Sequence, residues 1–277
     1  MPELPEVETV KRGLRSTVEG RRFTYVETRR GDLRIPFPED FANRLTGRRV
    51  QRLWRRAKYI LADLDAGETL VIHLGMSGRI TVYGSGVEVR SGKHDHVVFD
   101  TDAPAHIVFT DHRRFGLMTI VETASIESHA LFKDLGIEPL SKQFNVAYLE
   151  AELKGKKTPV KSALLDQRVI AGLGNIYACE ALWRARISPK RRAARLKRNE
   201  ISLLVPAIKE VLEDAVKAGG SSLRDHRRTN GELGYFQKAF AVYDREGQPC
   251  LRRGCKGTIK RIVQSGRSTF FCPTCQV

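Results

Sequence analysis

The sequence has no long hydrophobic run, since no apolar stretch approaches the roughly 18 residues of a membrane-spanning helix. Its first residues are polar and acidic, which does not fit a secretory signal or a transit peptide. Internal repeats and low-complexity tracts are also missing. These absences predict a soluble globular protein of the cytoplasm with no membrane partner.

Cysteine is scarce: the chain has five, and four of them lie within the last 28 residues. So few and so clustered cysteines exclude a disulfide framework and favour a local metal site in a reducing compartment. The remaining one, Cys179, is expected to be a small buried apolar residue.

Acidic residues are outnumbered, with 32 Asp and Glu against 48 Lys and Arg, a formal net charge of +16 and a pI near 9.9. This balance favours a polyanionic partner such as nucleic acid, although charge alone does not separate DNA from RNA. The length of 277 residues and the 41% hydrophobic content are enough for two domains with ordinary cores.

From about Arg21 to Val121, short β-rich runs alternate with turn residues such as Asp65-Ala66-Gly67 and Gly84-Ser85-Gly86. The expected strands are Phe23 to Thr28, Val50 to Trp54, Tyr59 to Leu64, Thr69 to Leu74, Arg79 to Tyr83, His96 to Phe99, His106 to Thr110 and Leu117 to Val121. Their regular spacing predicts an antiparallel β-sandwich with one leading helix, in a domain of residues 1–135.

Beyond about Ile126 the hydrophobic period becomes helical. Helices are expected over residues 128–135, 146–153, 158–165, 175–184 and 199–218. Asn199 can cap the last of these, and Pro206 should kink it or mark a helix start within it. The fold class is therefore α+β and multidomain, with a linker at 136–145, a helical domain at 146–235 and a separate tail at 236–277.

The first fourteen residues contain a candidate nucleophile. Removal of Met1 would leave Pro2 with a free secondary amine, and an α-amino group titrates near pH ~7.7 to 8.0. At physiological pH a useful fraction of the Pro2 amine is then neutral, and the neutral amine can condense with a sugar aldehyde to give an iminium ion. Pro5 suits a helix start that would hold Glu3 and Glu6 beside this amine. The alternative is that Pro2 follows Met1 by chance and that the acids simply favour a helix N-terminus.

The tail carries the pattern Cys250-x4-Cys255-x16-Cys272-x2-Cys275, two cysteine pairs separated by the length of a β-hairpin. Four thiolates complete the tetrahedral coordination of one Zn²⁺ ion. A tail of this length can bury little apolar surface, so it needs a metal ion or another cross-link to be ordered. The pattern predicts one structural zinc ion, and the alternative is four free thiols in a frayed end.

Two further stretches have both a structural and a functional interpretation. Gly172-Leu173-Gly174-Asn175 opens a predicted helix, where Asn175 and free N–H groups can meet an anion, but a Gly-rich turn with an Asn cap has the same pattern. Residues 184–198 hold eight Arg and Lys and no acid, and we interpret most of that run as a solvated face.

The opening Pro2-Glu3-Leu4-Pro5-Glu6-Val7-Glu8-Thr9 resembles that of the formamidopyrimidine-DNA glycosylases, the bacterial-type enzymes that remove oxidised purines from DNA. The resemblance extends from Pro2 to Cys275, and it implies a helix-two-turn-helix domain followed by a zinc β-hairpin. The family usually spaces its first cysteine pair by two residues, so the four residues between Cys250 and Cys255 are a departure that alters this knuckle.

The resemblance also implies the catalytic residues. Pro2 would be the nucleophile and Glu3 its acid/base partner, with Glu6 in possible support. Lys58, in Arg55-Arg56-Ala57-Lys58-Tyr59, matches the essential lysine that contacts the DNA backbone and donates a proton during β-elimination. Arg267 matches the DNA-contacting arginine of the zinc hairpin.

DNA contacts follow by the same resemblance. Met76, Arg113 and Phe115 match the three residues that fill the gap left by an extruded base, a role that offsets the cost of unstacking. The other implied contacts are His94, Arg114, Lys156 and Asn175. His112 departs from the proline common at that place, which puts the shape of its loop in doubt. His94 and His96 could instead suggest a metal, but no third ligand is evident in the sequence.

The implied activity is excision of 8-oxoguanine opposite cytosine, or of ring-opened formamidopyrimidines, from damaged double-stranded DNA. A Pro2 Schiff base and β,δ-elimination would then nick the strand. The polar, Gly-rich segment from Gly219 to Tyr235 suits a mobile loop that closes over the flipped base, and it also fits an interdomain linker. A bacterial-type, nucleoid-associated monomer is expected. The alternatives are an endonuclease VIII type glycosylase for oxidised pyrimidines and a non-catalytic zinc protein that binds nucleic acid by charge.

Overall fold

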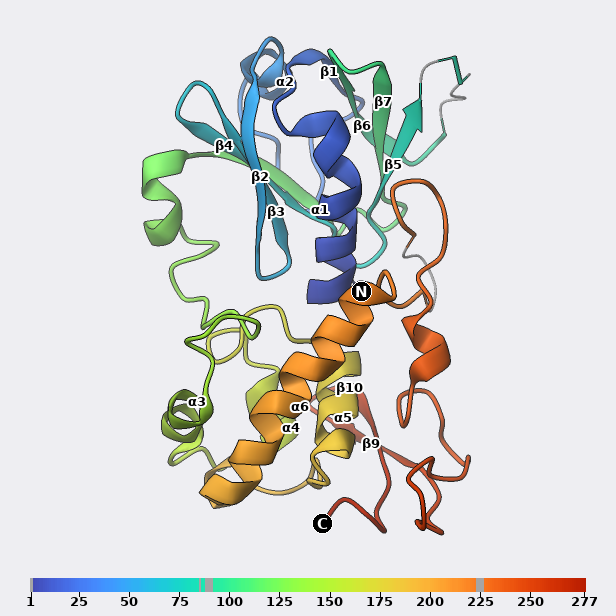
Figure 1. The fold of residues 1–277 in the computed structure, drawn as a ribbon. Coiled ribbons are helices and arrows are strands. Elements are labelled where there is room, and N and C mark those ends of the chain that lie inside the picture. The colour runs from blue at the N-terminus through green and yellow to red at the C-terminus, as the bar shows by residue number, and fades with distance from the viewer. Residues whose placement is uncertain (1, 85, 88–91, 223–226) are drawn as a thin grey trace. The chain divides into compact units, whose positions relative to one another are not determined.

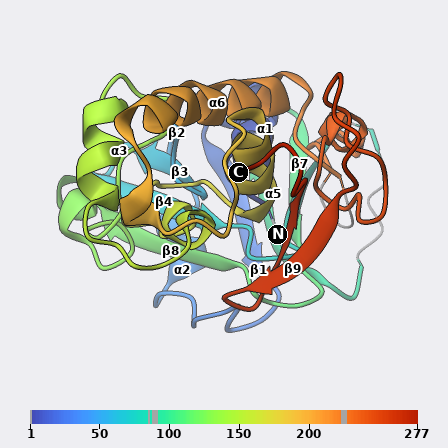
Figure 2. The ribbon, with the colours of Figure 1, turned by 90° about the horizontal axis from the view of Figure 1, so that it is seen from below.

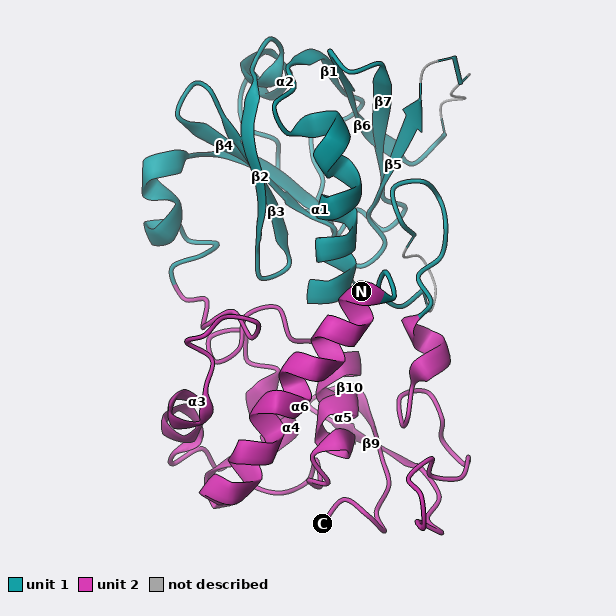
Figure 3. Cartoon of the chain, viewed as in Figure 1, with its two compact units in different colours: residues 1–133, 218–235 teal, residues 134–217, 236–277 magenta. Residues whose placement is uncertain are grey.

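The computed structural model describes residues 2–84, 86, 87, 92–222 and 227–277. The chain divides into two compact units, coloured separately in Figure 3. Unit 1 comprises residues 1–133 and 218–235, and unit 2 comprises residues 134–217 and 236–277. No helix among the described residues is both long and apolar enough to cross a membrane.

Unit 1 contains two four-stranded antiparallel sheets, ordered β1-β6-β7-β5 and β2-β3-β4-β8 (Figure 1). The strands are β1 (Phe23–Thr28), β2 (Val50–Arg56), β3 (Tyr59–Leu64), β4 (Glu68–His73), β5 (Arg79–Gly84), β6 (Asp95–Thr101), β7 (Ala105–Thr110) and β8 (Leu117–Glu122). Side chains of both sheets meet in one hydrophobic core, which confirms the predicted sandwich. Figure 1 shows helix α1 (Leu4–Val18) lying against β2 and β3.

Helix α1 closes this core because its apolar residues recur every three or four positions. Val7, Val10, Leu14 and Val18 all belong to the core cluster of the sandwich. A short helix, α2 (Phe41–Leu45), precedes β2 and was not expected from the sequence, because five residues are too few to show a period.

Unit 2 is mainly helical. Its elements are α3 (Val146–Leu153), α4 (Val160–Leu164), α5 (Asn175–Arg184), the short 3₁₀ turn η2 (Ala193–Arg195), α6 (Arg198–Lys217), the turn η3 (Phe236–Ala239) and the hairpin strands β9 (Lys260–Gln264) and β10 (Arg267–Phe271). Helix α5 contacts both α6 and β10, and Figure 2 shows α5 beside α6. Cys179 of α5 is buried in the same cluster as Ile259 and Phe270, so the tail shares a core with the helices of unit 2.

Two expectations for the helices are wrong, and one of the two alternatives for Pro206 is excluded. Residues 128–135 form no α-helix: the 3₁₀ turn η1 (Thr123–Ser128) is followed by turns, in which the His129 ring accepts the N–H of Leu131 and so competes with the helical ladder. Asn199 does not cap α6, which already begins at Arg198, and the Glu200 carboxylate accepts the N–H of Lys197 instead (2.8 Å). Pro206 lies inside a continuous α6 and starts no new helix.

Residues 218–235 belong to unit 1, although the sequence-based division puts them with the helical domain. Long-range hydrogen bonds explain the difference: the N–H of Ser221 binds Glu6 and the N–H of Val82 binds the carbonyl of Thr229. The expected linker at 136–145 likewise lies within unit 2.

Candidate active site and nucleic-acid interface

Two buried carboxylates lie at the amino end of α1. Glu3 is the N-cap residue, its N–H donates to Oε2 of Glu6 (2.9 Å), and the two residues form a capping box. Glu3 is 2% exposed, Glu6 is 1% exposed and Pro2 is also buried. The structure therefore brings together the three amino-terminal residues that the sequence predicts for the site. The positive end of the helix dipole stabilises carboxylates at this place.

Glu6 has a second role that sequence reasoning missed. Its Oε1 accepts the N–H (2.7 Å) and the hydroxyl (3.0 Å) of Ser221, a residue 215 positions away. One buried carboxylate thus joins the start of α1 to the 218–235 segment. Residues 223–226 of the predicted lesion loop lie outside the described residues.

Lys58 lies in the tight turn between β2 and β3 and is only 7% exposed. The turn has Ala57 at φ +51°, and the Arg55 guanidinium donates to the Ala57 carbonyl (2.7 Å). Arg55 also forms an ion pair with Glu8 of α1 (3.2 Å), with both side chains largely buried. The lysine turn is therefore tied to the helix that carries Glu3.

His73, which the sequence did not single out, lies beside this turn, because Tyr59 and His73 are paired across β3 and β4. Burial, with smaller contributions from the positive charges of Lys58 and Arg34, lowers the pKa of His73 from 6.5 to about 4. The neutral ring accepts the N–H of Gly75 at Nδ1 (3.0 Å), which links this strand end to the following loop.

We expect the free energy of unfolding to fall as the pH drops from about 6.5 to 4. The unfolded chain takes up the His73 proton below about pH 6.5, whereas the folded chain takes it up only near pH 4, so protonation favours unfolding in this window by an amount on the order of 3 kcal/mol. Urea denaturation at several pH values measures it. His73→Gln should flatten the dependence and the exposed control His112→Gln should not; equal curves for all three proteins would contradict this assignment.

Two loops of unit 1 are locked together by Asp111, another residue that sequence reasoning missed. Asp111 is fully buried and accepts hydrogen bonds from the Ser77 hydroxyl (2.5 Å) and from the N–H of Gly116 (2.7 Å). Gly75, at φ +62°, approaches the second loop so closely that a Cβ there would lie 2.3 Å from the carbonyl carbon of Phe115. The sequence offered one signal for this role, because Asp111 stands between a predicted strand and Gly116. A carboxylate buried at such a place needs several hydrogen-bond donors, and the backbone of a turn supplies them.

The predicted gap-filling residues project from these two loops. Met76 is 36% exposed and Phe115 is 46% exposed, although both are large apolar side chains. The Arg113 guanidinium lies over the Phe115 ring, 4.7 Å from its centroid. Arg114, exposed, has φ +58° and completes the turn. The hydrogen bonds of Asp111 thus hold together the two loops from which Met76, Arg113 and Phe115 project into solvent.

The exposed His94 lies near the same loop, and its carbonyl accepts the N–H of Asp111 (2.9 Å). The rings of His96 and His112 lie 6.4 and 6.3 Å from that of His94. Across the described residues, the only group of three or more ligand side chains close enough for a metal is the cysteine cluster.

In unit 2, Asn175 is the first residue of α5, with Gly174 as the N-cap. Its amide donates to the carbonyl of Ser268 (2.9 Å), which the fully buried Lys161 also binds (3.1 Å). Ser268 follows Arg267, the exposed first residue of β10. Asn175 and Lys161 thus hold the strand that carries Arg267, and the half-buried Lys156 precedes α4 on the same unit.

Glu180 is a further buried acid that the sequence did not reveal. It accepts the N–H groups of Ala241, Val242 and Tyr243 at 2.8 to 2.9 Å. Burial raises its pKa, while these three donors act in the opposite direction. Its role is to fix the chain between η3 and the cysteine hairpin.

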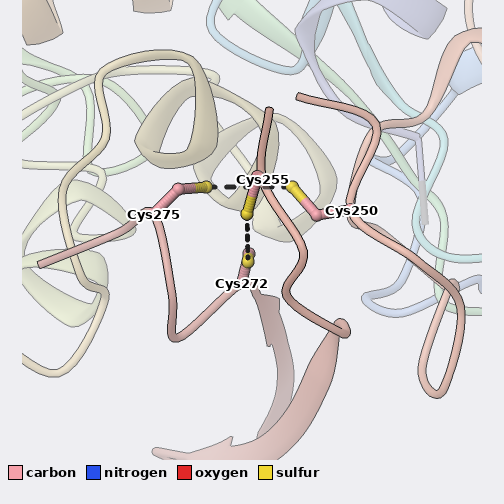
Figure 4. A group of neighbouring side chains, drawn as sticks. All are labelled: Cys250, Cys255, Cys272 and Cys275. Atoms are coloured by element: carbon pink, nitrogen blue, oxygen red, sulfur yellow. Dashed lines mark hydrogen bonds between the residues drawn. The ribbon is translucent and has the colours of Figure 1, made fainter. Parts of the chain in front are cut away.

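The four tail cysteines converge, as Figure 4 shows. Their sulfur atoms all lie within 4.8 Å of one another, with Cys250–Cys275 at 3.8 Å and Cys255–Cys272 at 3.6 Å. A tetrahedral zinc with Zn–S bonds of about 2.3 Å requires sulfur atoms about 3.8 Å apart. The residues therefore fit one structural zinc ion, as predicted.

Arg252 anchors the four residues that separate Cys250 from Cys255. Its guanidinium lies over the Trp183 ring of α5, 4.5 Å from the centroid, and donates to the Trp183 carbonyl. The indole N–H of Trp183 in turn donates to the Cys250 sulfur (3.4 Å). Because the extra residues are attached to α5, the longer knuckle still places Cys250 and Cys255 at one site.

Unit 1 has two antiparallel sheets and buried acids at its amino end, and unit 2 has helices joined to a hairpin with four thiolates. With the formal charge of +16, these features define the class as a two-unit zinc protein that binds nucleic acid. The family model described as the formamidopyrimidine-DNA glycosylase N-terminal domain matches residues 1–118, and the H2TH domain of that family matches residues 135–227. A zinc finger found in FPG and IleRS matches residues 247–277.

The chain is 58% identical to a formamidopyrimidine-DNA glycosylase of Jannaschia sp. (strain CCS1), over all of both chains. It is 33% identical to a Lactococcus lactis FPG mutant solved with Fapy-dG containing DNA, with a TM-score of 0.90 and 99% of each chain covered. A MutM structure in complex with carbocyclic 8-oxo-G containing DNA is 34% identical, with a TM-score of 0.89 and 99% of each chain covered. The chain belongs to the formamidopyrimidine-DNA glycosylase family, a family of DNA glycosylases and abasic-site lyases, and the comparisons thus favour this family over the two alternatives.

Proposed function

We propose that this enzyme excises oxidised purines, 8-oxoguanine and formamidopyrimidines, from duplex DNA and cuts the strand through a Schiff base on Pro2. The observation that carries the proposal is the buried cluster of Pro2, Glu3 and Glu6 at the start of α1, in a chain whose relatives bind Fapy-dG and 8-oxo-G containing DNA. A buried nucleophile beside a buried acid is suited to attack on a sugar carbon.

In the proposed reaction, the Pro2 nitrogen bonds to C1′ of the deoxyribose and loses its proton. The bond from C1′ to the base breaks, and the base leaves with that electron pair and takes up a proton. Glu3 assists proton transfer at the sugar while the ring opens to an iminium ion.

The iminium acidifies the neighbouring C–H bonds, so loss of a C2′ proton expels the 3′ phosphate by β-elimination. A δ-elimination then expels the 5′ phosphate, which leaves a one-nucleotide gap with phosphate ends. Lys58 is the proposed proton donor during β-elimination, and Arg267 the proposed contact to the DNA backbone. The low exposure of Lys58 supports a defined task, because a solvated lysine would be mobile.

We further propose that Met76, Arg113 and Phe115 fill the space left by the extruded base, and that His94, Arg114, Lys156 and Asn175 bind the DNA. The exposure of Met76 and Phe115 on two loops held together by Asp111 supports the first role, since adjoining exposed apolar side chains mark an interaction site. The position of Asn175 beside Arg267 supports its contact, because its side-chain amide donates to the Ser268 carbonyl (2.9 Å) of the strand that carries Arg267.

Alanine substitution of Arg113 or Phe115 should reduce lesion excision by about five- to 150-fold and leave non-specific duplex affinity nearly unchanged. The stacked pair acts at the vacated base, a loss of about 1 to 3 kcal/mol, whereas non-specific binding is mostly phosphate electrostatics. Single-turnover excision and fluorescence anisotropy measure the two quantities. The exposed Arg48→Ala, outside the proposed contacts, is the matched control for charge loss. Equal losses of excision and affinity would identify the pair as general contacts.

The proposed site of action is bacterial DNA in the cytoplasm, at the nucleoid, with the protein acting as a monomer. The bacterial relatives support the location, and the formal charge of +16 supports DNA association. The function itself is tested with duplexes that carry 8-oxoguanine opposite cytosine, an oxidised pyrimidine or an abasic site. Preferential cutting at the first and third supports the proposal, and preference for the oxidised pyrimidine would overturn the purine assignment.

A further inference from the structure

A basic segment of unit 2 takes no part in the proposed reaction. Residues 190–195, which we call the basic arch, connect α5 to α6 within a longer run of eight Arg and Lys and no acid over residues 184–198.

The arch has a defined backbone. The N–H of Val160 donates to the Arg191 carbonyl (2.7 Å), and the N–H of Ala193 donates to the Thr158 carbonyl (2.9 Å). Ala193 is buried and anchors the segment, whereas Lys190, Arg192 and Arg195 are exposed. An ordered base lowers the entropy cost of presenting these cations to a ligand.

The cations of the arch surround a hollow of about 490 Å³, lined by Lys190, Arg191, Arg192 and Arg195. Arg191 is already used inside the protein, because it pairs with Glu200 (2.9 Å) and donates to the Arg195 carbonyl (3.0 Å). This ion pair is structural: the Arg191 hydrogen bond holds the pKa of Glu200 below its usual range.

The other three cations of the arch are exposed. Within the described part of the chain, no acidic partner is recorded for Lys190, Arg192 or Arg195, and the Lys190 ammonium lies 5.6 Å from the centroid of the Phe271 ring. Like charges gathered around one hollow repel one another, so a multivalent anion placed there stabilises the arrangement.

The arch adjoins a proposed DNA contact, since the N–H of Ala194 donates to the carbonyl of Lys156 (3.0 Å). We propose that the basic arch is a second binding surface for DNA phosphates, in which Lys190, Arg192 and Arg195 hold duplex DNA away from the lesion. This second surface rests on the proposed function, because both require DNA as the partner. The phosphates come either from the flanks of the lesion duplex or from a second duplex.

The test compares the variant K190Q/R192Q/R195Q with the control R48Q/K142Q/K217Q. The control removes three exposed cations outside the arch, none with a recorded acidic partner in the described residues, so both formal charges fall from +16 to +13 (16 − 3). Arg191 is kept because it supports Glu200. Binding to undamaged duplexes of increasing length is measured over a range of salt concentrations.

We expect the arch variant to lower the slope of log affinity against log salt by about 2 to 3, since each lost phosphate contact lowers it by about 0.9. The control should change the slope little. A drop that appears only above a threshold duplex length assigns the phosphates to the flanks. A drop on short duplexes, with loss of a two-duplex complex in native mass spectrometry, assigns them to a second duplex.

Excision from the shortest lesion duplex separates this inference from the proposed function, because it needs Pro2 and not the arch. If the triple variant is unstable, the single variants R192Q and R195Q should each lower the slope by about 0.9. Equal slopes for arch and control variants at every duplex length overturn the proposal. So does a variant that loses binding to an acidic peptide or to anionic vesicles but not to DNA.

Discussion

Borohydride added during the reaction on a lesion duplex is expected to leave a stable covalent protein–DNA adduct on Pro2. Reduction converts the iminium ion to an amine that no longer hydrolyses, so the adduct reports which nitrogen attacked the sugar. Mass spectrometry of the digested adduct locates the modified residue. An adduct on a lysine instead would remove Pro2 from the centre of the mechanism.

Blocking the amino terminus should abolish this chemistry. Retained Met1, or a tag placed before Pro2, converts the secondary amine to an amide, and we expect excision to fall by at least about a thousandfold, as for loss of a catalytic nucleophile. The same tag placed after Val277, which is exposed, is the matched control and should leave excision intact. Pro2→Gly keeps a terminal amine but loses the ring, so partial activity should remain. Full excision by the blocked protein would contradict the assignment.

Glu3→Gln separates the acid from the nucleophile. The amide retains the shape of the buried side chain but cannot donate and accept a proton as a carboxyl group does, so base excision should fall steeply. Trapping on a pre-formed abasic site should suffer less, because that sugar is already an aldehyde. Equal loss of both would show that Glu3 acts on the helix start, where it caps α1, and not on the reaction.

Loss of zinc is expected to abolish duplex binding. Cys272→Ala removes one of four thiolates, and a structural zinc site contributes folding free energy on the order of 10 kcal/mol, so the 250–277 segment should lose its order. That segment carries Arg267 and the Ser268 carbonyl held by Lys161. Elemental analysis should find one zinc per native chain and much less in the variant, and anisotropy measures DNA affinity.

Cys179→Ala is the matched control, because Cys179 is buried in the same cluster as Cys250 and Cys272 but is not a ligand. Removal of this sulfur should cost about 1 kcal/mol of stability and leave both zinc and DNA binding in place. Strong duplex binding by protein without zinc would show that the metal is not needed for the interface.

Local patterns determined much of this protein. The bounds of β1, β3, α3 and α5 agree with the sequence-based expectation, because each is a β-rich or helically periodic run bounded by turn residues. The zinc site was also readable, since cysteine spacing alone limits which residues can meet at a metal. Shorter or irregular elements were missed or misplaced, as with α2 and residues 128–135.

The arrangement of buried polar groups could not be predicted in this way. Glu6 was predicted only as support for the amine, whereas the structure also shows it binding Ser221. No sequence pattern predicted a role for Asp111 or Lys161, yet both side chains are fully buried. Asp111 holds the loop of Phe115, and Lys161 holds the strand of Arg267, so both support candidate DNA contacts. A single residue type gives no indication of which distant backbone group will meet it.

The sequence by itself thus determined the chemistry available: a proline at position 2 with neighbouring acids, four zinc ligands and a positive charge suited to DNA. Only the tertiary structure decided that residues 218–235 join unit 1 and that Ser268 is held by Lys161, more than a hundred positions away. The physical reason is that periodicity and spacing are local properties. The partner of a buried polar group, by contrast, is selected by long-range packing, which must satisfy every buried donor and acceptor at once.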